Sequence, residues 1–191
     1  MKKILIIGMN YIGDTIFITP LIRAIKKHYK DCIIDIVNGK RGIDILKENP
    51  HINKIIIREE NTLENLLKNI KKENYDIGFA ATTAFYGASI LYKAKIPIRA
   101  GVSSELRGIF LNKKTSWKKH KRHIVDTILS ILKPMNIETD GIKTELFLTE
   151  EENNFGIEKM KNYKNCLLVH GGATRISKRY NAENFAELIE M

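Results

Sequence analysis

Two glycine turns, each directly after an apolar run, hold the residues of this sequence that are best placed to do chemistry. The first spans residues 8–15, Gly-Met-Asn-Tyr-Ile-Gly-Asp-Thr, and presents a carboxylate at Asp14. In α/β folds, a strand that runs into a glycine turn and then a helix brings ligands to the carboxyl end of that strand. The turn lacks the Gly-x-Gly of a dinucleotide site and the Gly-Lys-Ser/Thr of a phosphate loop. It therefore offers one carboxylate at the functional edge of a sheet, unless Asp14 only caps the following helix.

The second turn spans residues 170–180 and combines glycines with a hydroxyl group and basic side chains. Gly171 and Gly172 free backbone amides, and Thr174 and Lys178 follow before a helical pattern begins. Free backbone amides, a helix N-terminus and a lysine together favour phosphate or pyrophosphate as the ligand. The alternative is a basic turn that is merely solvated.

Short β-rich runs alternate with helical patterns along the chain, which is typical of a parallel α/β sheet. The first run is continuously apolar, which indicates a strand covered on both faces. We therefore predict a doubly wound parallel sheet of Rossmann-like type. The predicted strands are Lys3–Ile7, Ile33–Val37, Lys54–Ile57, Ile77–Ala81, Arg99–Val102 and Leu167–His170.

Helical patterns separate these strands. In Pro20–Tyr29 the apolar residues share one face, and Thr19 before Pro20 predicts an N-cap. Residues 103–121 predict a long, irregular basic loop. The other predicted helices are Leu63–Lys72, His123–Lys133, Glu150–Asn162 and Ala182–Glu190.

The pattern changes around residues 134–150, where a first domain (1–145) is predicted to close. Residues 146–191 are predicted to be a linker and the start of a second domain. One strand and two helices do not make an independent domain. We therefore expect most of the second domain to be missing from this chain.

The composition favours some partners over others. The formal net charge is +10, which first suggests nucleic acid. The basic residues are spread over many segments, however, and no helix-turn-helix, zinc finger or aromatic RNA-binding signature is present. Nucleotide sugars, phosphorylated sugars and an anionic membrane surface fit the charge equally well. The densest basic cluster is Lys113, Lys114, Lys118, Lys119, Lys121 and Arg122.

Cysteine use and hydropathy point to a cytoplasmic protein. Cys32 and Cys166 lie inside apolar runs, so both are predicted to be buried free thiols. No spacing of cysteine and histidine predicts a metal site. No apolar stretch is long enough for a membrane span, and the N-terminal run is too short for a signal peptide.

Taken together, several separated segments resemble the heptosyltransferases of glycosyltransferase family nine, which build the inner core of lipopolysaccharide from ADP-heptose. The resemblance runs in order along essentially the whole chain. It is carried by Met1–Asp14, Thr83–Ala88, Ile96–Gly101, Leu106–Asn112, His123–Val125 and Gly172–Tyr180.

The resemblance implies the N-terminal half of a GT-B fold, with the acceptor on the first domain and the nucleotide on the second. It implies an inverting transfer without an essential metal and without a cofactor, the donor being a nucleotide sugar such as ADP-heptose. Asp14 would be the base that accepts the proton of the acceptor hydroxyl group. Thr174 and Lys178 would stabilise the charge on the departing phosphate.

On the acceptor side, Arg107 and the basic loop 113–122 are expected to hold an anionic glycolipid, the alternative being solvated surface charges. Asn10, Tyr11 and Gly13 are expected to line the acceptor pocket. Peripheral contact with the inner membrane is a further expectation. A different class of function, a non-catalytic glycan-binding module derived from such an enzyme, is the alternative, and a nucleic-acid binder is the third.

Overall fold

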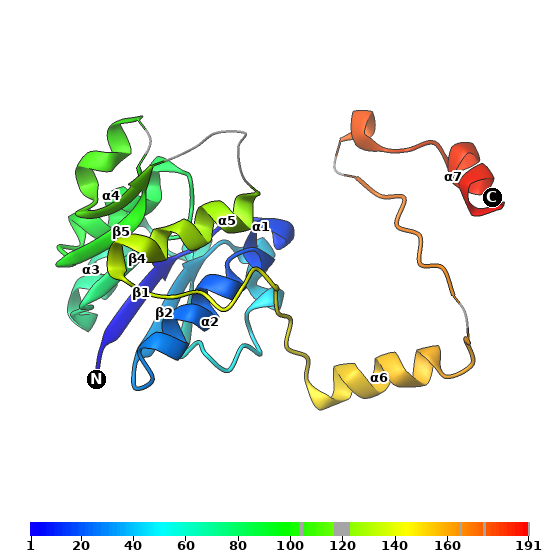
Figure 1. The fold of residues 1–191 in the computed structure, drawn as a ribbon, viewed down its shortest axis with the longest axis horizontal. Helices are drawn as coiled ribbons and strands as arrows, with labels where there is room; N and C mark the ends of the chain where they lie inside the picture. The colour runs from blue at the N-terminus through cyan, green and yellow to red at the C-terminus, as the bar shows by residue number, and fades with distance from the viewer. Residues whose placement is uncertain (104, 117–122, 165, 174, 191) are drawn as a thin grey trace. The chain divides into compact units, whose positions relative to one another are not determined.

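The computed structural model describes residues 1–103, 105–116, 123–164, 166–173 and 175–190. The chain divides into two compact units, Met1–Thr149 and Glu150–Met191, and each is described by itself (Figure 1). The predicted domain division, 1–145 and 146–191, stays a prediction.

The N-terminal unit is built on one six-stranded parallel sheet. The strand order is β3-β2-β1-β4-β5-β6, so the sheet extends from β1 in both directions, as the predicted doubly wound fold requires. In the middle of the sheet, Ile6 stands between Ile36 and Phe79, and all three side chains are buried. The strands are β1 (Lys3–Ile7), β2 (Ile33–Asn38), β3 (Lys54–Ile57), β4 (Ile77–Ala80), β5 (Ile98–Ser103) and β6 (Lys113–Ser116).

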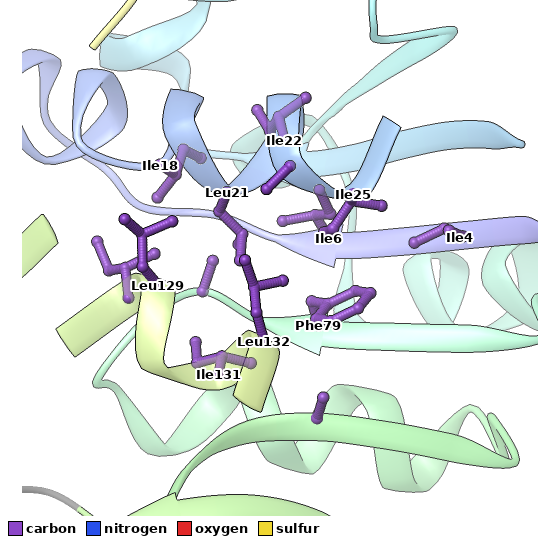
Figure 2. Packing of buried hydrophobic residues seen from close by; sticks show 14 of the residues in the cluster. Ile4, Ile6, Ile18, Leu21, Ile22, Ile25, Phe79, Leu129, Ile131 and Leu132 are labelled. Atoms are coloured by element: carbon purple, nitrogen blue, oxygen red, sulfur yellow. The ribbon is translucent and has the colours of Figure 1, made fainter. Parts of the chain in front are cut away.

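Helices cover both faces of this sheet (Figure 1). α2 and the α5–η4 segment bury one face, where Leu21 and Leu132 meet above Ile6 and Phe79 (Figure 2). α3 and α4 bury the other face. The helices of this unit are α1 (Ile12–Ile16), α2 (Thr19–His28), α3 (Leu63–Glu73), α4 (Phe85–Lys93) and α5 (Ile124–Leu129), with the short 3-10 helices η1 (Lys40–Ile45), η2 (Arg58–Glu60), η3 (Glu105–Phe110) and η4 (Ser130–Met135).

One strand lies where the sequence predicted a loop. β1 and β3 have the predicted bounds, β2 and β4 differ from the prediction by one residue at one end, and β5 is one residue longer at each end. The segment 103–121, however, contains η3 and then β6, which pairs with β5. β6 reads Lys-Lys-Thr-Ser, and such polar, lysine-bearing strands are typical of sheet edges. The apolar pattern used to find strands does not detect them.

The predicted strand Leu167–His170 is wrong, because these residues have no regular secondary structure. A strand needs a neighbour to receive its backbone hydrogen bonds. The described residues of the C-terminal unit form no strand that could pair with it. For the same reason Cys166 is exposed rather than buried, whereas Cys32 is buried as predicted.

Two predicted helices differ in local detail. Thr19 is not the N-cap of α2 but its first residue; its hydroxyl group donates to the Ile16 carbonyl at 2.8 Å and accepts from the Glu145 amide at 2.9 Å. The predicted helix His123–Lys133 is α5 followed by η4. Pro134 lies inside η4, and because proline has no N–H to donate, it disfavours a continued α-helix there.

The C-terminal unit contains α6 (Glu150–Met160), η5 (Ile176–Lys178) and α7 (Ala182–Glu190). The Tyr180 and Phe185 rings meet edge to face, with their centroids 5.1 Å apart. This contact folds the second glycine turn back onto α7.

Candidate active site

A pocket of about 220 Å³ opens where the sheet changes its direction of winding, between the carboxyl ends of β1 and β4. The connections after these two strands leave toward opposite faces of the sheet, and doubly wound folds bind their ligands in the crevice that results. The residues that line it come from the β1–α1 turn and α1, from η2, from the β4–α4 turn and α4, and from α5: Met9, Asn10, Tyr11, Asp14, Arg58, Thr82, Thr83, Ala84, Tyr86 and Ile124.

Asp14 is the single carboxylate among these lining residues. It lies in the first turn of α1 and is half-buried. The N-cap of α1 is Tyr11, and no side chain caps the helix. Within the described residues, the Asp14 carboxylate takes part in no hydrogen bond or ion pair. The capping role that the sequence left open is therefore not seen, and the carboxylate is available to a ligand.

The turn that carries Asp14 is held by neighbouring strands. The Gly8 amide donates to the Val37 carbonyl at 2.8 Å, and the Gly39 amide donates to the Met9 carbonyl at 2.9 Å. From the other side, the Tyr86 hydroxyl group donates to the Gly8 carbonyl at 2.9 Å. β2 and α4 thus fix the backbone of this turn from both sides.

Asn38, at the end of β2, joins both ends of the Asp14 segment. Its side chain is 1 % exposed. Its Oδ1 accepts from the Met9 amide at 3.0 Å, and its Nδ2 donates to the Thr15 hydroxyl group at 3.3 Å. Asn38 therefore bridges the turn before α1 and the residue after Asp14. The sequence reasoning missed it, although an amide at the end of an apolar strand and directly before a glycine is a usable signal.

Arg58 brings a positive charge to the pocket and was also missed. Its Nη2 donates to the Asn10 side-chain oxygen and to the Glu59 carboxylate, both at 2.6 Å. The guanidinium lies over the Tyr86 ring, 5.0 Å from the centroid, within range of a cation–π interaction. Partial burial acts to raise the pKa of Glu59, but the hydrogen bond from the Lys40 amide, together with the charge and hydrogen bond of Arg58, lowers it below its usual value. Arg58 follows β3, so only the strand order places it beside Asp14.

Asn10 and Tyr11 line the pocket, as expected for acceptor-side residues, although their role stays a prediction. The Tyr11 ring is exposed, and the Arg41 guanidinium lies 5.4 Å from its centroid. Gly13 is exposed in α1, and a Cβ added to it would meet nothing within 4 Å.

Arg107 lies elsewhere in the unit. It belongs to η3, is 7 % exposed, and donates from Nε to the Val102 carbonyl at 3.1 Å. It is a buried arginine, not the solvated surface charge considered as the alternative, and it is not among the residues that line the pocket. Of the basic loop 113–122, the structure describes residues 113–116, which are β6. Its role in acceptor binding, like that of Arg107, stays a prediction.

The second glycine turn belongs to the C-terminal unit. Thr174 lies outside the described residues. Lys178 ends η5 and is exposed, and Arg179 donates from Nε to the Ala173 carbonyl at 2.9 Å. Since each unit is described by itself, the structure does not bring Lys178 and Asp14 into one site.

The part of the chain that the structure describes contains neither a cluster of metal-ligating side chains nor a membrane-spanning helix. No group of three or more histidine, cysteine, aspartate or glutamate side chains there could hold a metal ion. No helix there is both long and apolar enough to cross a bilayer.

Comparison with known proteins identifies lipopolysaccharide and lipooligosaccharide heptosyltransferases among the relatives of this chain. Lipopolysaccharide heptosyltransferase 3 of Escherichia coli is 26 % identical over 95 % of this chain and 57 % of its own length. Lipooligosaccharide heptosyltransferase 2 of Haemophilus influenzae is 31 % identical over 61 % of this chain and 36 % of its own. The solved structure of E. coli ADP-heptose lps heptosyltransferase II matches all of this chain and 60 % of its own, with a TM-score of 0.76 at 22 % identity. The match to this solved structure shows that the two chains share a fold.

This chain thus spans less than two thirds of the length of these relatives. The family model described as glycosyltransferase family 9 (heptosyltransferase) matches residues 63–191, which is more than half of the chain. The chain therefore belongs to glycosyltransferase family 9, the heptosyltransferase family.

Proposed function

We propose that this protein transfers a heptose from ADP-heptose to an anionic acceptor of the lipopolysaccharide-core type, with inversion at the anomeric carbon and without a metal ion. The observation that carries the proposal is the unpaired carboxylate of Asp14 in the pocket between β1 and β4. Family membership supports glycosyl transfer as the class of reaction. The names of the relatives support heptose as the sugar.

In the proposed reaction, an acceptor hydroxyl oxygen attacks the anomeric carbon, and the bond from that carbon to the diphosphate breaks. The electron pair leaves with ADP, and the proton of the hydroxyl group passes to the Asp14 carboxylate. A positioned base of this kind contributes about 10²–10⁴ in rate. Thr174 and Lys178 are proposed to stabilise the departing diphosphate, because charge develops there as the bond breaks.

The acceptor is proposed to lie against the N-terminal unit. Arg58 supplies a cation at the pocket that holds Asp14, and its two hydrogen bonds fix the direction of the guanidinium. Such a planar donor group suits a carboxylate or phosphate on the acceptor sugar. We place the reaction in the cytoplasm, at the cytoplasmic face of the inner membrane.

The test is ADP release from ADP-heptose in the presence of heptose-deficient lipopolysaccharide, with protein expressed from its complete reading frame. Asp14→Ala is expected to lower the rate by about 10²–10⁴ and to change thermal stability little, since no described residue forms a hydrogen bond or ion pair with the Asp14 carboxylate. Gly13→Ala, one residue away in open space, is the matched control for stability. Near-wild-type transfer by Asp14→Ala would refute the assignment of the base. Acceptor binding without any transfer by the wild type would instead support the glycan-binding alternative.

A further inference from the structure

The outer surface of α4 and η3 exposes apolar side chains next to an excess of positive charge. Leu106 and Ile109 are 74 % and 69 % exposed, more than any other large apolar side chain of the described N-terminal unit except Met1. Because a 3-10 helix has three residues per turn, residues three apart stand one above the other. Leu106 and Ile109 therefore form a single apolar ridge on η3, while Arg107 between them is buried.

A row of aromatic rings joins the end of η3 to α4. Phe85 and Tyr92 are seven residues apart, which places them on one face of the helix. The Phe110 ring at the end of η3 lies between them, 5.3 Å from Phe85 and 5.2 Å from Tyr92 by ring centroids. Phe85 and Tyr92 are both about half exposed. We call the five side chains and their flanking cations the α4–η3 surface: Phe85, Tyr92, Leu106, Ile109 and Phe110, with Lys93, Arg99 and Lys113.

The charge of this part of the chain is strongly one-sided. Residues 77–116 contain six lysines and arginines and one acidic residue, Glu105, so this stretch contributes +5 of the net +10. Lys93 and Lys113 are exposed. Arg99 is held in place, with its Nε donating to the Phe110 carbonyl at 2.8 Å and its guanidinium 5.5 Å from the Tyr92 ring centroid.

We propose that the α4–η3 surface docks this protein onto an anionic lipid bilayer. Lysines are depleted at the cores of protein–protein interfaces, whereas they favour contact with anionic headgroups. Aromatic rings and aliphatic side chains beside them suit the boundary between headgroups and acyl chains. η3 packs against α4 and β5, which carry Lys93 and Arg99. The apolar ridge and the basic residues thus belong to one part of the unit, which favours a lipid partner over a protein one. The inference goes beyond the proposed transfer reaction, and its test contains neither donor nor acceptor sugar.

The experiment is co-sedimentation of the full chain with phosphatidylcholine vesicles, with and without phosphatidylglycerol. The wild type is expected to bind only the anionic vesicles, and more weakly as salt is raised. Leu106→Asp/Ile109→Asp is expected to weaken binding at least about tenfold, because it removes two inserting side chains. Lys93→Glu/Lys113→Glu is expected to weaken it at least about 30-fold, the loss expected from removing two lysines before repulsion by the new carboxylates is added.

Two control variants keep the chemistry of the change but move it away from this surface. Leu63→Asp alters another exposed leucine, at the start of α3, and Lys68→Glu/Lys72→Glu changes the net charge by the same amount on α3. Both are expected to bind like the wild type. Absence of wild-type binding to anionic vesicles, or equal binding by surface and control variants, would overturn the proposal. So would a wild-type dimer in solution that Leu106→Asp/Ile109→Asp dissociates, because the occupant would then be a second copy of the chain.

Discussion

The closest backbone approach around the candidate site is at Gly39, and Gly39→Ala tests whether that approach fixes the Asp14 turn. A Cβ on Gly39 would lie 1.9 Å from Oδ1 and 2.8 Å from Cα of Asn10. The φ of Gly39 is −74° and its ψ is 146°, which alanine adopts without strain. The expected cost of the substitution is therefore steric and arises entirely from Asn10.

The magnitude follows from these distances. Carbon atoms in good contact lie about 3.5–4.0 Å apart, so the backbone of Asn10 has to move away by roughly 1 Å. Forcing such a shift in a packed region costs about 1–3 kcal/mol. The Asn10 amide must also rotate and lose its bond from Arg58, and a bond to a charged group contributes about 1.5–3 kcal/mol. Since Arg58 keeps Glu59 as a partner, we expect a total of roughly 2–4 kcal/mol.

The assay measures how fast a thiol reagent labels Cys32, which is 4 % exposed and lies in the N-terminal unit. Cys166 is replaced by serine in all variants, so that only this unit is reported. A loss of 2–4 kcal/mol raises the opened fraction, and with it the labelling rate, roughly 30- to 900-fold. Gly13→Ala is the matched control and is expected to be neutral or up to about 1 kcal/mol more stable. A labelling rate for Gly39→Ala equal to that of Gly13→Ala would refute the reasoning.

Three further perturbations test other parts of the N-terminal unit. Asn38→Leu leaves buried backbone groups without a partner and is expected to lower the free energy of unfolding by roughly 3 kcal/mol, measured by urea denaturation. Burial raises the pKa of the Cys32 thiol, so a thiol reagent at mildly alkaline pH is expected to label Cys166 rapidly and Cys32 only on unfolding, as peptide mapping would show. The hydrogen bond from Lys3 lowers the pKa of Glu73 from its usual value of 4.5. The Lys3–Glu73 pair therefore stabilises the fold fully above pH 4.5, and this contribution is lost as the pH falls through the lowered pKa. Glu73→Gln is expected to lower the melting temperature slightly at neutral pH, the pair being exposed, and not at all in acid.

Much of the fold could be predicted because the sheet is buried on both faces. β1 and β3 are short runs rich in isoleucine, one ending at a glycine turn and the other at a charged residue, and their pattern admits few other interpretations. β6 could not be found this way, since its four residues are polar and its pairing with β5 alone makes it a strand. Leu167–His170 shows the converse, because an apolar run becomes a strand only where a neighbouring strand receives its hydrogen bonds.

The candidate site likewise contains residues that the sequence could predict and residues that it could not. Asp14 could be found because a local signal, a glycine turn after an apolar strand, marks the carboxyl edge of a sheet. Arg58 and Tyr86 could not, since one follows β3 and the other begins α4, and they meet at Asn10 and Gly8 through the strand order. Arg107 was predicted to bind the acceptor from the family resemblance and its charge, but neither reveals that its side chain folds inward to a backbone carbonyl.

The polar groups around the Asp14 turn differ from the Asp14 carboxylate in their hydrogen bonding. The amides of Gly8 and Met9, the Gly8 carbonyl and the Asn38 side chain all have partners within the fold. Hydrogen bonds of this kind stabilise one conformation of the turn, because breaking any of them leaves a buried group unsatisfied. Because no described residue forms a hydrogen bond or ion pair with the Asp14 carboxylate, its presence in a rigid, half-buried pocket is not explained by such bonds within the fold. Rigid support around an unused reactive group is what a preorganised site requires, and it is the physical reason for assigning the chemistry to Asp14 and the positioning to its neighbours.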